Sequence, residues 1–259
     1  MTETSHAYLR AMGIDYFVAR ANSDSPGAPA ESPGLPEAAL ELVRSSASLP
    51  VGSNPQPTPS MPIENVERPP VVAADNWAEL EAQVNACRAC TACESRTQPL
   101  LGSGASDAKW LFVTDSPSAD QDQSGDVFAG PGGVLLKDML FALGLDASNA
   151  YSTPLLKCRT PGGRDPVDLE ITQCSEYLQA QIKLLRPSVI VALGRVAAQT
   201  LTGSDAPLAR LRGHIHTTGK FSAPVVASYR PEYLLQSPAK KASSWQDLKL
   251  ALKALGDEA

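Results

Sequence analysis

The sequence predicts an α/β protein with three layers, α/β/α, around a central parallel sheet of about four strands. Short apolar runs alternate with amphipathic helical segments from residue 76 onward, and within each run the apolar residues are continuous. Continuous apolar strands separated by helices are typical of a parallel sheet that is covered on both faces. The 259 residues, 43% of them hydrophobic, are enough for one good-sized core.

The expected elements follow one another in a regular order. Helices are expected at residues 76–87, 132–145 and 168–187, and strands at residues 109–114, 150–156, 188–194 and 223–228, the third strand running into residues 195–203. In parallel sheets the working residues lie in loops after the carboxyl ends of the strands. These loops begin at Thr114, Leu156, Gly194 and Ser228.

The first 75 residues have a different composition. Residues 22–75 hold 11 of the 22 prolines and hardly an aromatic residue. Such a segment buries too little apolar surface to offset its chain entropy, so it is expected to be a disordered linker. Residues 1–21 are expected to form a short helix and turn, an apolar hook, and residues 76–259 the folded domain.

The charge distribution argues against a broad nucleic-acid-binding surface. The net charge is −6, of which −5 lies in residues 1–75. Any contact with DNA would therefore be local. Five residues are available for such a contact: Arg195, Arg210, Arg212, Lys240 and Lys241. They form either a phosphate-binding patch or an ordinary solvated surface. A cytoplasmic location is expected, because the sequence shows no long apolar span and no signal-peptide pattern.

The five cysteines indicate a metal centre. Cys87, Cys90 and Cys93 form a C-x-x-C-x-x-C run, and Cys158 and Cys174 follow later in the chain. In a reducing compartment, cysteines are expected to bind a metal or to be buried rather than to form disulfides. Four thiolates suit a [4Fe–4S] cluster or a tetrahedral zinc ion, and one cysteine is surplus to either.

From Cys87 to Leu248 the chain resembles the iron–sulfur (family 4) uracil-DNA glycosylases. The stretches that carry the resemblance are "CRACTACESRTQPLLGSG", "VFAGPGGVLLKDML", "KCRTPGGRDP", "EITQC", "RPSVIVALGRVAAQTL", "RLRG" and "RPEYLL…SPAKK…WQDL". The resemblance implies the uracil-DNA glycosylase-like fold. It also favours a [4Fe–4S] cluster over zinc, with Cys87, Cys90, Cys158 and Cys174 as ligands and Cys93 as the extra cysteine.

Four positions carry the chemistry of that family, and three of them differ here. The aromatic residue that stacks the flipped base corresponds to Phe128, for which simple packing is the alternative. Asp115 stands for the family's glutamate, in a loop that has also lost both of its glycines. Pro154 stands for the uracil-reading asparagine, four residues before Cys158, and it supplies neither a donor nor a side-chain acceptor.

Arg230 replaces the histidine of the family's His-Pro pair. Arginine also donates hydrogen bonds and is always cationic, but it cannot exchange a proton. The histidines of this chain do not obviously substitute, and His214 and His216 fit the exposed face of a hairpin. After Pro231, an apolar anchor is expected from Tyr233, Leu234 and Leu235.

A second resemblance concerns the N-terminal hook. The stretch "LRAMGIDYFVAR" is similar to the N-terminus of the psi subunit of the bacterial DNA polymerase III clamp loader. The matching residues are Leu9, Met12, Gly13, Ile14, Phe17 and Arg20. This resemblance implies that residues 1–21 bind clamp-loader proteins and that the domain binds the chi subunit.

Together, the altered chemical positions and the hook favour a non-catalytic, psi-like replication subunit built on a glycosylase fold. The alternative is an active or altered uracil-DNA glycosylase, in which Asp115 holds the water, Phe128 stacks the base and Arg230 stabilises the uracil anion. A DNA-damage-binding module without chemistry lies between these two hypotheses.

Overall fold

The computed structural model describes residues 74–146 and 148–256, and its centre is a six-stranded sheet. The strands are β1 (Ser103–Gly104), β2 (Trp110–Thr114), β3 (Ala150–Pro154), β4 (Val189–Leu193), β5 (Ile215–His216) and β6 (Val225–Ser228). They lie in the order β1-β3-β2-β4-β6-β5, with parallel pairing among the four central strands and antiparallel pairing at both edges.

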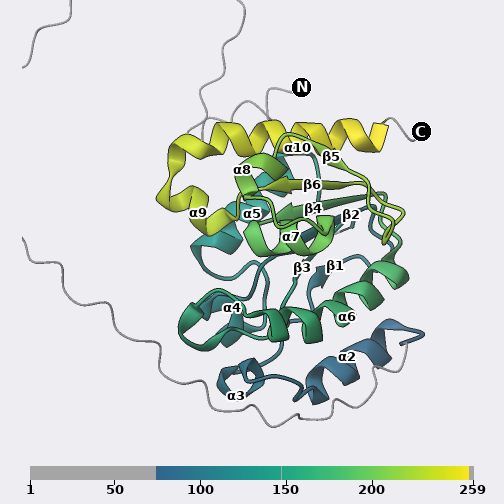
Figure 1. Ribbon diagram of the computed structural model, residues 1–259, viewed down its shortest axis with the longest axis vertical. Coiled ribbons are helices and arrows are strands. Elements are labelled where there is room, and N and C mark those ends of the chain that lie inside the picture. The colour runs from purple at the N-terminus through teal and green to yellow at the C-terminus, as the bar shows by residue number, and fades with distance from the viewer. Residues whose placement is uncertain (1–73, 147, 257–259) are drawn as a thin grey trace, which may run out of the picture. The chain divides into compact units, whose positions relative to one another are not determined.

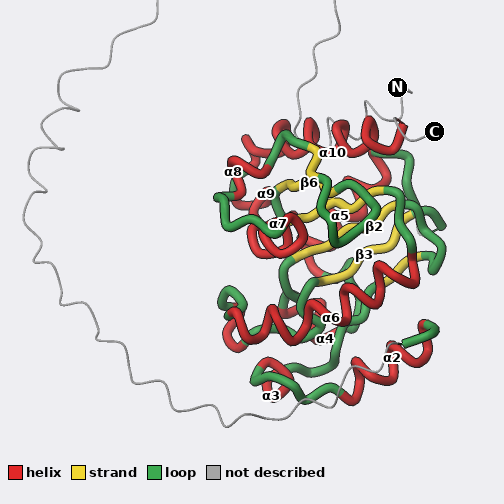
Figure 2. The backbone as a smooth tube through the Cα atoms, turned by 45° about the vertical axis from the view of Figure 1, so that its right-hand side comes forward, coloured by secondary structure: helices red, strands yellow, loops and turns green. Residues whose placement is uncertain are grey.

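Helices cover both faces of this sheet (Figure 1). They are α2 (Trp77–Ala86), α3 (Ala92–Ser95), α4 (Ala119–Ser124), α5 (Gly130–Ala142), α6 (Asp168–Leu185), α7 (Arg195–Thr202), α8 (Leu208–Leu211), α9 (Pro231–Gln236) and α10 (Lys241–Gly256). Two 3₁₀ turns, Pro161–Gly163 and Pro238–Lys240, complete the described structure. The tube in Figure 2 shows the yellow strands enclosed between red helices.

The alternation of side chains along the strands divides the core into two layers. In β2, Leu111 and Val113 pack with α2, α6 and α7, whereas Trp110 and Phe112 pack with α5, α9 and α10. All four side chains are buried. Because both faces of the central strands are covered, β2, β4 and β6 are almost wholly apolar, which produces the continuous runs of the sequence, whereas β3 also buries Ser152 and Thr153.

The three-layer architecture expected from the sequence is confirmed, and the structure extends the sheet. The four expected strands are the four central ones, and two short edge strands, β1 and β5, are added to them. Each edge strand is only two residues long, too short for a periodic pattern to predict it. Among the described residues, no helix is both long and apolar enough to span a membrane.

The N-terminal hook and most of the linker lie outside the described residues. The six positions expected to bind a partner, Leu9, Met12, Gly13, Ile14, Phe17 and Arg20, all lie outside the described residues. The division into hook, linker and domain therefore stays a prediction.

Candidate active site

A pocket of about 280 Å³ lies at the carboxyl ends of the parallel strands. The register sets Thr114 of β2 beside Leu193 of β4, and Leu193 beside Ser228 of β6, so the residues that follow these strands converge. The lining consists of Asp115, Asp165, Gly194, Arg195, Leu208, Tyr229, Arg230 and Tyr233. The structure thus brings together Asp115 and Arg230, which the sequence placed 115 residues apart.

Asp115 is the buried acid of this pocket. Its side chain is 7% exposed, and its Oδ1 accepts a hydrogen bond of 2.7 Å from the backbone N–H of Ala197, in the first turn of α7. Burial raises the pKa of Asp115 to about 6, and the Ala197 hydrogen bond and the charge of Arg230 oppose that rise. A carboxyl group with such a pKa is ionised at neutral pH and can still exchange a proton.

The turn between β4 and α7 is shaped to admit this carboxyl. Gly194 has φ of 128°, a conformation that residues with a side chain rarely adopt. A Cβ atom on Gly194 would also collide with the carboxyl of Asp115. Gly194 therefore allows the close approach of Asp115 to the start of α7.

At Ser118, where the family resemblance implies a glycine, the loop after Asp115 forms a helix-capping box. Ser118 caps α4: its hydroxyl accepts the N–H of Gln121, and the Gln121 side chain accepts the N–H of Ser118. This capping box fixes the loop that follows Asp115. Ser118 has a negative φ, so a glycine is not required at that position.

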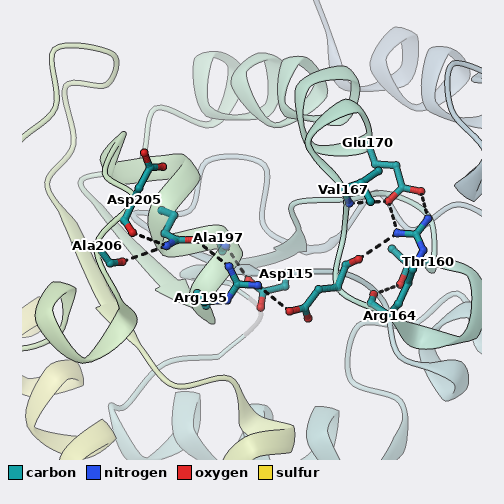
Figure 3. A network of polar contacts seen from close by, with 11 residues as sticks. Asp115, Thr160, Arg164, Val167, Glu170, Arg195, Ala197, Asp205 and Ala206 are labelled. Carbon is teal, nitrogen blue, oxygen red and sulfur yellow. Dashed lines mark hydrogen bonds and ion pairs between the residues drawn. The ribbon is translucent and has the colours of Figure 1, made fainter. Parts of the chain in front are cut away.

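Two arginines lie on the pocket wall. Arg230 is exposed and precedes the first residue of α9, Pro231. Arg195 forms an ion pair with Asp165, with 2.7 Å between Nη2 and Oδ2. Figure 3 shows Arg195 beside Asp115.

The loop that carries Asp165 is held by a buried acid. Glu170, 1% exposed, accepts two hydrogen bonds from Arg164, at 2.9 and 2.8 Å (Figure 3). Arg164 also donates to the backbone carbonyl of Asp165. Burial raises the pKa of Glu170, but the hydrogen bonds from Arg164 and Val167 hold it below its usual value. Glu170 therefore stays ionised and fixes this side of the pocket.

Phe128 and Pro154, the other two chemical positions, are not among the residues that line the pocket. Phe128 is half-buried ahead of α5 and packs against the core layer of that helix. Pro154 is the buried last residue of β3, where β1 no longer pairs with the strand, so its missing N–H costs no sheet hydrogen bond.

A buried lysine behind Pro154 was missed at the sequence level. Lys157 is 1% exposed, and its Nζ donates to Thr153 Oγ1, to the carbonyl of Pro154 and to Gln181 Oε1. Burial lowers its pKa to about 7. The available signal was a lysine that directly follows an apolar strand and precedes Cys158.

All five cysteines line a single small cavity between α2, the loop after β3 and α6. Cys158 Sγ accepts a hydrogen bond of 2.9 Å from Arg96 Nη1, and Cys174 Sγ accepts one of 3.2 Å from the Lys157 N–H. Hydrogen bonds to sulfur of this kind are typical of thiolate-bound metal centres, where they tune the ligands.

The cysteine side chains fit a thiolate-bound cluster. Burial raises the pKa of Cys158 to about 11 and that of Cys174 to about 12, so binding as thiolates requires the positive charge of a metal. Within residues 74–146 and 148–256, no three potential ligands are grouped closely enough to hold a single ion.

Two of the five cations considered for a phosphate-binding patch are paired with acids. Arg212 is only 13% exposed and is paired with Asp247 at 2.7 Å, and Arg195 is paired with Asp165. Arg210 and Lys240 are exposed. The edge strand β5 holds His216, whose Nε2 contacts the carbonyl of Leu211 at 2.7 Å. Neither His216 nor His214 lines the pocket.

Fold and site together define a class: an α/β/α domain with a buried acid and an arginine in one pocket at the carboxyl ends of a parallel sheet. The chain belongs to the uracil DNA glycosylase superfamily, whose sequence profile matches residues 101–249. A type-4 uracil-DNA glycosylase of Archaeoglobus fulgidus is 33% identical over 177 residues, which cover 66% of this chain and 89% of the relative. One of Thermotoga maritima is 33% identical over 157 residues, 60% of this chain and 81% of the relative.

These relatives overturn the expectation of a non-catalytic, psi-like subunit, because the similarity extends over most of the length of glycosylases. The prediction was wrong because it gave three substitutions and the N-terminal hook more weight than the similarity over the rest of the domain. In the folded chain, the acid and the cation still share one pocket. The family match begins at residue 101, so the clamp-loader resemblance of residues 9–20 gains no support from it.

Proposed function

We propose that this protein is a uracil-DNA glycosylase that hydrolyses the N-glycosidic bond of uracil in DNA. The observation that carries the proposal is the placement of the buried acid Asp115 and the cation Arg230 in one pocket, in a chain 33% identical to type-4 uracil-DNA glycosylases. Enzymes of this kind extrude the target nucleotide from the base stack into such a pocket.

Asp115 is the residue that orients the attacking water. Its Oδ1 is engaged by the N–H of Ala197, and we assign Oδ2 to the water. The water oxygen bonds to C1′ of the sugar while the bond from C1′ to N1 of uracil breaks, and the water's proton passes to Asp115. The ordered contact with Ala197 fixes the carboxyl group, which matters because a displacement of about 1 Å costs on the order of 100-fold in rate.

Arg230 stabilises the leaving group. The electron pair of the broken bond passes to the uracil ring, whose oxygens gain negative charge, and a permanent cation lowers the energy of that charge. Arg230 lies on the same pocket wall as Asp115 and is exposed at its mouth. Its proton does not transfer, so the uracil anion takes its proton from solvent.

We further propose that Cys87, Cys90, Cys158 and Cys174 hold a [4Fe–4S] cluster, with Cys93 as an additional thiol on the same cavity. The cluster would supply a covalent link between three segments that are distant in sequence. One of these segments, the loop after Cys158, continues to Arg164 and Asp165 on the pocket side.

Release of free uracil tests the proposal directly. The full-length protein is incubated with single-stranded and double-stranded oligonucleotides that carry one uracil, and the released base and the abasic product are quantified by mass spectrometry. Matched oligonucleotides with thymine at the same position serve as controls. Uracil release from the uracil substrates supports the proposal, and no release from either strand form contradicts it.

A further inference from the structure

A buried polar network lies behind the turn that carries Arg230. Asp247, on α10, is 2% exposed, and its Oδ2 accepts a hydrogen bond of 2.7 Å from the hydroxyl of Ser228, the buried last residue of β6. The hydroxyl of Ser244, also on α10, lies 2.8 Å from Ser228 Oγ. Because Ser228 gives its one proton to Asp247, Ser244 is the donor of that second bond. The carboxylate and the two hydroxyls therefore join α10 to the end of β6.

The carboxylate of Asp247 also holds the arginine that covers the next residue of the turn. Arg212 Nε and Nη2 each lie 2.7 Å from Asp247 Oδ2, and the guanidinium carbon of Arg212 lies 4.0 Å from the centroid of the Tyr229 ring. A guanidinium at this distance makes a cation–π contact with the ring. Ser228 and Tyr229 are thus both tied to Asp247, one directly and the other through Arg212.

The backbone on either side of these contacts is fixed as well. The carbonyl of Arg230 accepts the N–H of Tyr233, in the first turn of α9, at 3.1 Å. The carbonyl of Ser228 accepts the N–H of Gly194 at 3.0 Å, and Gly194 belongs to the turn that the Asp115 carboxyl approaches closely. The end of β6 therefore connects the two residues of the site, because it leads into Arg230 and is bonded to the turn that admits Asp115.

Attachment of α10 to the sheet does not account for this network. The helix already packs on the sheet through four buried apolar side chains, Trp245, Leu248, Ala251 and Ala254. Burial raises the pKa of Asp247, and the hydrogen bonds from Ser228 and Arg212 oppose that rise. A buried ion pair is often no more stabilising than apolar residues of similar volume. A polar network whose members are all hydrogen-bonded does, however, hold them in one arrangement.

We infer that Asp247 and Ser228 are positioning residues: they fix the end of β6 and so set where the Arg230 guanidinium lies relative to the Asp115 carboxyl. Their part in excision rests on the proposed function, in which Asp115 orients the water and Arg230 stabilises the departing uracil. Neither Asp247 nor Ser228 lines the pocket, so both act through the residues that do. The Arg230 side chain is exposed, so its backbone is the part of the residue that the protein holds in place.

Titration of Asp115 tests the positioning separately from excision. The charged groups that face its carboxyl are Arg230, Arg195 and Asp165, and the charge of Arg230 lowers the pKa of Asp115. Carbon-13 NMR of full-length protein labelled in its aspartate carboxyl groups measures this pKa, and Asp115→Asn identifies the resonance. Arg230→Ala is expected to raise the pKa of Asp115 above about 6 because it removes the cation. Ser228→Ala is expected to raise it too, by a smaller amount, because the cation is displaced but retained.

A double-mutant cycle tests the same residues in the reaction. Ser228→Ala is expected to lower the single-turnover rate of uracil excision about tenfold, since a displacement of about 1 Å costs on the order of 100-fold and the turn keeps its other contacts. In the Arg230→Ala background it is expected to change the rate by less than about twofold, because no guanidinium remains to be positioned.

Ser152→Ala is the matched control for Ser228→Ala. Ser152 is a serine of β3 that is 2% exposed, and its hydroxyl has no hydrogen-bond partner among the described residues. Its replacement removes a buried hydroxyl from the same sheet without breaking a hydrogen bond. The control is expected to leave both the excision rate and the pKa of Asp115 unchanged.

Asp247→Asn is a second variant, which serves if Ser228→Ala does not fold. It keeps an oxygen that accepts the Ser228 hydroxyl but loses the charge that holds Arg212, so it is expected to raise the pKa of Asp115 and to slow excision. An unchanged pKa of Asp115 in both variants, or additive rate effects of Ser228→Ala and Arg230→Ala, overturns the positioning inference. If the unmodified protein releases no uracil, the proposed function fails, and the titration alone decides whether Arg230 is positioned in this way.

Discussion

At the residue scale, the burial of the Asp115 carboxylate lowers the free energy of unfolding, which is the kind of cost found at functional sites. Its pKa in the folded protein is about 6, against an ordinary value of 3.8, because burial disfavours the charged form. The folded protein therefore binds this proton more tightly than the unfolded chain does, and the free energy of unfolding falls as the pH rises from about 4 to about 6. The loss is on the order of 3 kcal/mol above pH 6.

Replacing the charge should remove that cost. Asp115→Asn keeps an oxygen that can accept the N–H of Ala197, and it has no charge to bury. We expect the variant to be at least as stable as the unmodified protein at pH 7, as measured by urea denaturation. A loss of several kcal/mol would instead show that the carboxylate acts mainly as a helix cap for α7.

The same pKa sets the pH dependence of excision. Because Asp115 has to be ionised to orient water, the single-turnover rate should be constant above about pH 7 and fall about tenfold at pH 5, one unit below a pKa of about 6. An aspartate with an ordinary pKa would keep almost its full rate at pH 5. A flat profile down to pH 5 would contradict the assignment of Asp115.

Arg230 can be tested by two substitutions. Its side chain is exposed, so changes there should leave the fold intact. Arg230→Ala removes the cation beside the leaving group and is expected to lower kcat about 100-fold. Arg230→His restores the residue typical of the family and is expected to retain activity well above that of the alanine variant. Equal rates for unmodified and alanine proteins would remove Arg230 from the chemistry.

At the scale of elements, the regular parts of the fold could be predicted and the irregular parts could not. Buried strands such as β4 can be predicted from the sequence because every residue in them is apolar. The edge strands escape detection because two residues make no pattern. Tyr233 was expected to be an apolar anchor, because sequence alone cannot distinguish an aromatic residue that packs from one that lines a pocket.

The spacing of the cysteines in the sequence indicates a metal centre but does not show where Cys93 lies. The structure places Cys93 on the same cavity as the other four cysteines, with its N–H bonded to the carbonyl of Cys90. The ligand set therefore rests on the family resemblance and requires a direct test.

Cys90 and Cys93 form a matched pair for that test. Cys90→Ser is expected to lose most of the visible absorbance and iron, because a proposed ligand is removed. Cys93→Ser is expected to keep both, with about four irons per chain. Iron analysis and visible absorbance of the two purified proteins measure this. Loss of the cluster in Cys93→Ser, with retention in Cys90→Ser, would reverse the assignment.

At the scale of the whole molecule, the charge distribution implies a small electrostatic footprint on DNA. The chain carries a net charge of −6, and the cations Arg195 and Arg212 are already paired with acids. We expect the logarithm of Kd for single-stranded DNA to rise with the logarithm of salt concentration with a slope of about 2 or less, since each phosphate contact adds about 0.7. A slope above about 5 would show a broad basic surface and would contradict the small electrostatic footprint expected here.

The prediction of a non-catalytic subunit was wrong, and the reason lies in how the site residues are arranged in the whole molecule. Asp115, Pro154 and Arg230 each differ from the residue that the family resemblance implies, and the sequence does not show where their side chains lie relative to one another. The structure shows that Asp115 is buried, hydrogen-bonded and next to cations, whereas Pro154 is not among the residues that line the pocket. The relatives overturn the non-catalytic prediction, and the folded chain adds that Asp115 and Arg230 line the same pocket.

The ratio of single-turnover uracil excision rates between the full-length protein and its Asp115→Asn variant tests the central claim most directly. We expect measurable excision by the unmodified protein and a rate lower by on the order of 100-fold or more in the variant, with no loss of stability and with equal iron content. Excision that is unchanged in Asp115→Asn, or absent from the unmodified protein, would contradict the assignment of this pocket as a glycosylase active site.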